Sequence, residues 1–131
     1  MSAEVFNQVL SSWDVSNVTN MLRAFCFAYA FNGNISTWDV SNVTNMSEMF
    51  RGADAFNSDI SSWDIGAISM NLMFSGATIF NQDLSSWDVS NVTNMENMFD
   101  GNALSDENKC AIQTSFSTNS NWGHDWSGFC P

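Results

Sequence analysis

Basic residues are scarce in this chain. Of its 131 residues only 3 are Lys or Arg, against 14 Asp or Glu, which gives a net charge of −11 at pH 7. Three cations cannot neutralise a run of phosphates, so nucleic-acid binding is excluded, and anionic membrane surfaces are disfavoured for the same reason. The longest apolar run, residues 24–31, is much shorter than the roughly 18 residues that span a bilayer, so we expect no membrane insertion.

Proline, tyrosine and histidine occur once each, whereas Phe occurs 11 times, Met 8 times and Trp 6 times. A single His weakens the case for a zinc site. The first residues lack the charged and apolar regions of a cleavable signal peptide. Apolar residues make up 44% of the chain, which excludes global disorder, and the skew toward Phe, Met and Trp indicates one short unit copied several times.

A repeat of about 25 residues accounts for this skew. Each copy carries Phe-Asn followed by Trp-Asp, and the Trp residues of the four copies are Trp13, Trp38, Trp63 and Trp87. The units cover residues 6–30, 31–55, 56–79 and 80–103, so we divide the chain into a repeat region, residues 1–103, and a C-terminal region, residues 104–131. A period of this length is typical of a solenoid, in which each unit stacks on the next.

Within a unit, the sequence predicts one helix and one strand. Val43, Met46, Met49 and Phe50 have helical spacing and predict a helix over residues 43–51. Residues 35–40 are rich in β-branched and aromatic side chains and predict a strand. The predicted fold is an α/β, right-handed, leucine-rich-repeat-like solenoid, with a C-terminal cap helix over residues 106–116. Equivalent side chains then form buried columns, such as Phe25, Phe50, Phe74 and Phe99.

The unit Phe-Asn-x-Asp-Ile-Ser-Ser-Trp-Asp-Val-Ser-Asn-Val-Thr-Asn-Met-x-x-Met-Phe-x-Gly-Ala resembles the repeat of BspA-like leucine-rich-repeat surface proteins, a branch that includes a Mycoplasma-type lipoprotein repeat of unknown function. The resemblance spans some twenty positions in each of the four copies. It implies a secreted or surface-anchored protein of bacteria or marine microbes, and hence an extracellular or cell-surface location. It also implies a role in adhesion or protein binding, and it supplies no catalytic residues.

Two columns of the repeat are candidate sites. The Trp column, Trp13, Trp38, Trp63 and Trp87, forms either a core or a stacking surface for a glycan. The Asp column, Asp14, Asp39, Asp64 and Asp88, either accepts backbone hydrogen bonds in the following turn or, together with Asp59 and Asp83, binds Ca²⁺ as part of a calcium-stabilised scaffold. For both columns the structural interpretation is the one we favour.

The C-terminal region offers an alternative of a different class. Ser115, His124 and Asp125 are the residue types of a hydrolytic triad, so a small esterase or glycosidase-like hydrolase is the second hypothesis for function. No Gly-x-Ser-x-Gly motif supports it, and a surface His in a polar loop is the simpler interpretation. Cys110 and Cys130 are candidates for a disulfide, and Cys26 is an odd thiol without a neighbouring base.

We therefore expect a surface-exposed module that binds or adheres to a protein or carbohydrate ligand without catalysis and without a resident cofactor. Few residues precede the first unit, so its outer side is expected to expose apolar side chains and unpaired backbone. This open end predicts a homodimer, or further stacking, through the first coil.

Overall fold

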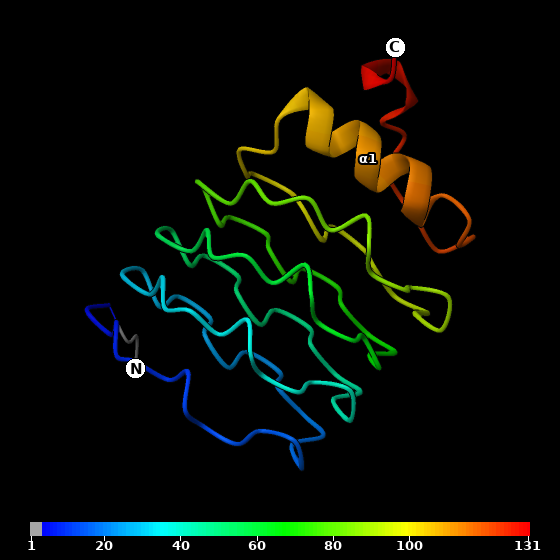
Figure 1. Cartoon of the computed structure of the whole chain (residues 1–131). Coiled ribbons are helices and arrows are strands. Elements are labelled where there is room, and N and C mark those ends of the chain that lie inside the picture. Colours follow the sequence, from blue (N-terminus) through cyan, green and yellow to red (C-terminus); the bar gives the residue numbers. More distant parts are fainter. Residues whose placement is uncertain (1–3) are drawn as a thin grey trace.

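A computed structural model describes residues 4–131 and shows a stack of coils with a helix at one end (Figure 1). We name residues 6–30, 31–55, 56–79 and 80–103 coils 1 to 4. Each coil lies on the next in chain order. The helix α1, Asp106–Phe116, lies on coil 4, and the N-terminus lies at the opposite end of the stack.

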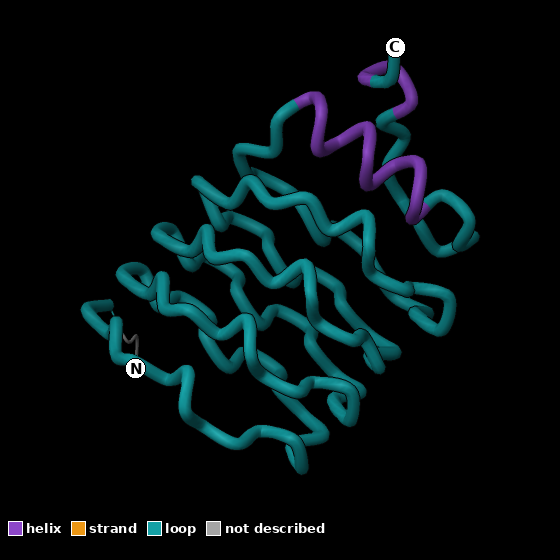
Figure 2. Tube along the Cα trace, in the orientation of Figure 1, coloured by secondary structure: helices purple, strands orange, loops and turns teal. Residues whose placement is uncertain are grey.

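The prediction of an α/β leucine-rich-repeat-like solenoid with one strand and one helix per unit is wrong. Among the described residues, the helices are α1 and the short 3₁₀ helix η1, Ser127–Phe129, and both follow the repeats. Figure 2 shows the coils as loop throughout. In the part of the chain that the structure describes, strand-like pairing is limited to isolated parallel bridges, which join Asn20, Asn45, Ser69 and Asn94 from coil to coil.

The backbone of residues 43–51 explains why no helix forms there. Glu48 has a φ of 55°, in the left-handed region, which a right-handed helix does not allow. The Met46 N–H donates to the Ser69 carbonyl of the next coil at 2.9 Å instead of to its own segment, while the Met49 N–H closes a turn on Met46. Turns linked in this way send apolar residues inward every three or four positions, which imitates the spacing of a helix.

Residues 35–40 form a turn where a strand was predicted. The Trp38 N–H donates to the Ile35 carbonyl at 3.1 Å, and the Trp38 indole Nε1–H donates to the Leu10 carbonyl of coil 1 at 3.0 Å. Three of the β-branched and aromatic residues that suggested a strand, Ile35, Trp38 and Val40, are buried side chains of the stack, and such burial is what β propensity often measures.

Stacked phenylalanines form the core. One ring from each coil joins a column with centroids 5.5–5.6 Å apart and planes within 8° of parallel, made of Phe25, Phe50, Phe74 and Phe99. Rings of a second column lie against the first at 4.0–4.2 Å, and these are Phe31, Phe56 and Phe80. Every inner ring therefore depends on the coils above and below it for burial.

A column of asparagines holds one corner of the stack. The Asn7 Oδ1 accepts the backbone N–H of Asn32, and the same bond recurs from Asn32 to Asn57 and from Asn57 to Asn81. The Asn81 Oδ1 then accepts the N–H of Ser105, the N-cap residue of α1. The column thus joins the repeats directly to the start of the helix.

The helix α1 begins where the sequence predicts it. The Ser105 side chain accepts the Asn108 N–H at 3.2 Å, and Ile112 and Phe116 are buried against coil 4. A disulfide joins Cys110 of α1 to Cys130 after η1. The aromatic tail packs back on coil 4, where Trp126 lies 5.6 Å from Phe99 between ring centroids.

Candidate functional site

The Trp column has one exposed member. The rings of Trp38, Trp63 and Trp87 are buried, and their indole N–H groups donate to carbonyls of the preceding coil. Trp13, in contrast, is 60% exposed. The stacking platform considered from the sequence is therefore reduced to the single indole of coil 1, because the other three rings are not accessible to a ligand.

Trp13 borders an open hollow of about 600 Å³ on the outer side of coil 1. The walls are mostly apolar and include Phe6, Leu10, Val18, Met21 and Phe25. Val5 and Val9, close by in sequence, are 90% and 82% exposed. The expectation that coil 1 exposes an apolar edge is confirmed, and a hollow of this kind is a candidate binding site.

One substitution within the repeat helps to open this hollow. Met49, Met73 and Met98 occupy one column in coils 2 to 4 and are fully buried. Coil 1 has Ala24 at the equivalent position, and Ala24 is exposed and lines the hollow. The smaller side chain leaves space next to Phe25 that a methionine fills in the other coils.

Backbone acceptors lie along the same end of the stack. In coil 2 the carbonyls of alternate residues accept N–H groups from coil 1, as Asn45 does from Met21 at 2.9 Å and Met49 from Phe25 at 2.8 Å. The equivalent carbonyls of coil 1 accept no hydrogen bond from residues 4–131, and they belong to Asn20, Leu22, Ala24 and Cys26. The candidate site therefore combines an apolar hollow, an exposed indole and a row of free acceptors.

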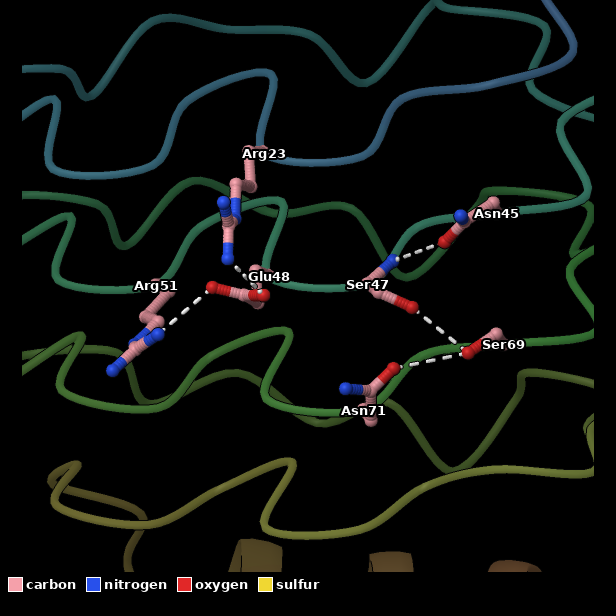
Figure 3. Close-up of polar contacts among 7 residues, drawn as sticks. All are labelled: Arg23, Asn45, Ser47, Glu48, Arg51, Ser69 and Asn71. Carbon is pink, nitrogen blue, oxygen red and sulfur yellow. Dashed lines mark hydrogen bonds and ion pairs between the residues drawn. The ribbon is translucent and has the colours of Figure 1, made fainter.

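An ion-pair cluster lies between coils 1 and 2 (Figure 3). Glu48 accepts hydrogen bonds from Arg23 and Arg51, each at 2.8 Å, and these bonds lower the pKa of the Glu48 carboxyl. Two of the chain's 3 basic residues are thereby committed to one carboxylate. Beside it, the Ser47 and Ser69 hydroxyls lie 2.8 Å apart and join coil 2 to coil 3. The cluster ties neighbouring coils together.

The Asp column follows the structural interpretation. The Asp14 Oδ1 accepts both the N–H and the hydroxyl of Ser16, Asp39 and Asp88 bond the serine two residues on, and these bonds lower the pKa of all three carboxyls. Asp64 is followed at that distance by Gly66 and has no such bond in the described structure. No group of three or more His, Cys, Asp or Glu that could hold a metal occurs within residues 4–131, and calcium stabilisation stays a prediction.

The three residues considered for a hydrolytic triad, Ser115, His124 and Asp125, make separate contacts. The His124 ring lies among aromatic rings, 4.7 Å from Trp126 and 5.0 Å from Trp122 between centroids, and burial lowers the pKa of its imidazole. The Asp125 carboxylate accepts the Ser127 hydroxyl at 2.6 Å. In the part of the chain that the structure describes, no hydrogen bond links Ser115, His124 and Asp125, and the contacts of the His124 ring are with aromatic side chains.

The cysteines separate as their positions suggested. Cys110 and Cys130 are joined, whereas Cys26 is a half-buried free thiol. Burial raises the pKa of the Cys26 thiol, which reduces its nucleophilic thiolate form. None of the helices formed by residues 4–131 is long and apolar enough to cross a membrane.

Comparison with known families decides the relationship of this chain. Residues 1–120 match the model of the family described as Mycoplasma protein of unknown function, DUF285. The chain belongs to this family. The match confirms the Mycoplasma-type part of the resemblance seen in the repeat. No curated protein and no solved structure shows significant similarity to the chain.

For this DUF285 chain, the repeat pattern predicted that the outer side of coil 1 is exposed, but it did not predict which hydrogen-bonding groups lie there. Unpaired backbone was expected on this side, but the sequence did not predict that it would be a row of carbonyls, those of Asn20, Leu22, Ala24 and Cys26, because backbone acceptors leave no mark in residue types. The hollow did have a signal in the sequence, since Ala24 interrupts a column of methionines. Reading that interruption as missing volume would have predicted it.

Proposed function

We propose that this chain is a binding module that recognises a polypeptide through the open end of coil 1. The observation that supports it is the contrast along one column: Trp13 is 60% exposed over an apolar hollow, whereas the equivalent Trp63 is 4% exposed. An exposed aromatic beside an apolar pocket is the composition of a protein-interaction centre.

A polypeptide fits this end better than a glycan. A glycan platform needs several accessible ring faces, and the column supplies one. The apolar walls of the hollow suit aliphatic or aromatic side chains, and the free carbonyls beside it suit backbone N–H donors. Apolar pockets next to an unpaired backbone edge are the two elements of peptide recognition by strand addition.

An extracellular or cell-surface location and a role in adhesion, as in BspA-like surface proteins, form the wider part of the proposal. The Cys110–Cys130 disulfide supports such a location, because disulfides persist in oxidising compartments. The acidic surface, with a net charge of −11, would favour partners that carry positive charge around an apolar contact.

A selection from a phage-displayed random peptide library tests the proposal. Peptides enriched on the wild-type chain should lose binding to Ala24→Glu, which places an unpaired carboxylate in the hollow, since burying such a charge is costly. Ala103→Glu, at an exposed alanine of coil 4, is the matched control and should bind them normally. Failure to enrich any peptide, or equal binding to both variants, would contradict a polypeptide site at coil 1.

A further inference from the structure

Most peptide groups that join neighbouring coils along residues 45–52 point one way, whereas the Thr44 N–H just before them donates in the opposite direction, to the Thr19 carbonyl of coil 1 at 2.8 Å. The N–H groups of Met46, Glu48, Phe50 and Gly52 donate to coil 3, whereas the carbonyls just before them, of Asn45, Ser47, Met49 and Arg51, accept from coil 1. The same direction holds between coils 3 and 4, as in the bond from Phe74 N–H to the Met98 carbonyl at 2.9 Å. This row of bonds therefore gives that face of the stack a direction along its length.

This polarity makes its two ends chemically different. Coil 1 ends in the row of free carbonyls defined above. Coil 4 ends in N–H groups that donate no hydrogen bond to residues 4–131, those of Met95, Asn97, Phe99 and Gly101. The indole N–H of Trp13 also lacks an acceptor in the described structure, although each equivalent indole donates to the preceding coil. Coil 1 thus offers a row of acceptors together with two kinds of donor, the Trp13 indole N–H and the backbone N–H of Thr19. The Thr19 N–H donates no hydrogen bond to residues 4–131, although the equivalent Thr44 N–H donates to coil 1.

The hydrogen-bonding groups of coil 1 restrict which polypeptide can bind at this end of the stack. Two copies meeting face to face would set carbonyls against carbonyls, which cannot bond. An intact second copy presents N–H groups at coil 4, but its Phe99 is already covered by Phe116 and Trp122 of its own tail. The required occupant carries donors and an uncovered apolar row on the same side, as coil 2 does toward coil 3.

We propose that the exposed side of coil 1 binds, in parallel register, a polypeptide segment that follows this chain's own Asn-Met-x-x-Met-Phe repeat pattern. Alternate N–H groups of the segment donate to the carbonyls of coil 1, and its apolar side chains fill the hollow beside Ala24. A carbonyl of the segment accepts the Trp13 indole N–H, as the Leu10 carbonyl does from Trp38. This inference rests on the proposed polypeptide site and names its partner class.

Calorimetric titration with synthetic peptides tests the proposal. The probe is a 25-residue peptide with the sequence of residues 31–55, which should bind the wild-type chain. N-methylation of the peptide at Met46 and Phe50 removes two of the donating groups and should weaken binding by at least roughly tenfold. N-methylation at Asn45 and Asp54, whose amides donate no hydrogen bond within residues 4–131, is the matched control and should have a much smaller effect.

Two chain variants complete the design. Ala24→Glu should abolish binding of the unmodified peptide and Ala103→Glu should preserve it. Equal weakening by both methylated peptides would overturn the hydrogen-bonded register. A different outcome of sedimentation is that the chain is a dimer and that the peptide does not separate its two copies. This result would identify a second copy as the occupant of coil 1 and would also overturn the proposal. If library peptides bind but the repeat peptide does not, this inference fails while the proposed polypeptide site stands.

Discussion

The two ends of the stack carry the same repeat and differ in what covers them. At coil 4 the ring of Phe99 meets Phe116, Trp122 and Trp126 of the C-terminal region. At coil 1 the described structure leaves a hollow of about 600 Å³ against the equivalent Phe25. The comparison teaches that burial in a stacked repeat is supplied by the neighbour and is not a property of the unit itself.

The largest expected contrast is between two tryptophans of one column. Trp63→Ala removes a buried ring stacked 6.4 Å from Trp87 and should lower the free energy of unfolding by about 3–5 kcal/mol. Trp13→Ala removes a mainly exposed ring and should cost less than about 1 kcal/mol. Urea unfolding of both variants measures the difference. Similar losses would mean that the end of coil 1 is covered in solution.

The Cys110–Cys130 disulfide allows the covering of coil 4 to be tested directly. Replacing Cys110 and Cys130 by Ser opens a link between residues 20 positions apart and should lower the free energy of unfolding by about 3 kcal/mol. The free thiol Cys26 supplies the control, because Cys26→Ser breaks no covalent link. Urea unfolding under non-reducing conditions measures both. An unchanged midpoint for the double variant would show that the tail covers coil 4 without help from the disulfide.

The asparagine column should show a smaller difference in stability loss between a position inside the stack, Asn57, and one at its end, Asn7. The Asn57 Oδ1 accepts from the Asn81 N–H and the Gln82 Nε2, and Gln82 Nε2 also donates to the Asn57 backbone carbonyl. Asn57→Ala therefore leaves the partly buried Asn81 N–H unmatched and should cost about 1–3 kcal/mol. Within residues 4–131, the exposed Asn7 side chain accepts one hydrogen bond, from the exposed Asn32, whose N–H can bond to water instead, so Asn7→Ala should cost less than about 1 kcal/mol. Thermal unfolding compares the two, and a larger loss for Asn7→Ala would contradict the end-dependent view.

The smallest effect expected is a pH dependence at the covered end. Burial holds the pKa of His124 below its ordinary value of 6.5, so the folded state binds a proton less readily than the unfolded state. Stability should therefore be fully present above that pH and decline as pH falls below it. His124 is the only His, so His124→Gln should flatten unfolding midpoints measured between about pH 7.5 and about pH 5.5. An identical slope in the variant would assign the dependence to carboxylates.

The sequence predicted which side chains are buried in the stack better than it predicted the conformation of the backbone. The repeated Phe, Met and Trp positions identified the buried columns, and the residues after the last repeat identified the limits of α1, because side-chain burial and capping leave marks in residue types. The helix over residues 43–51 was wrong because turns closed on Met46 place apolar residues inward at the same spacing. A left-handed residue such as Glu48 gives no warning, since Gly and Asn are the residue types that signal positive φ.

The candidate site was predictable in part for the same reason. An exposed apolar edge at coil 1 follows from the repeat alone. The carbonyl row does not, since it depends on the direction in which Met21 and Phe25 donate to coil 2. The direction of these hydrogen bonds is set by the backbone conformation, which residue types do not reveal.

Oxidative footprinting of the tryptophans tests the openness of coil 1 most directly. Hydroxyl radicals followed by peptide mass spectrometry report how accessible each ring is in the native chain. We expect Trp13, at 60% exposed, to be oxidised much faster than Trp38, Trp63 and Trp87, which are at most 6% exposed. Protection of Trp13 to the level of Trp63 in the isolated chain would contradict an open, polypeptide-binding end.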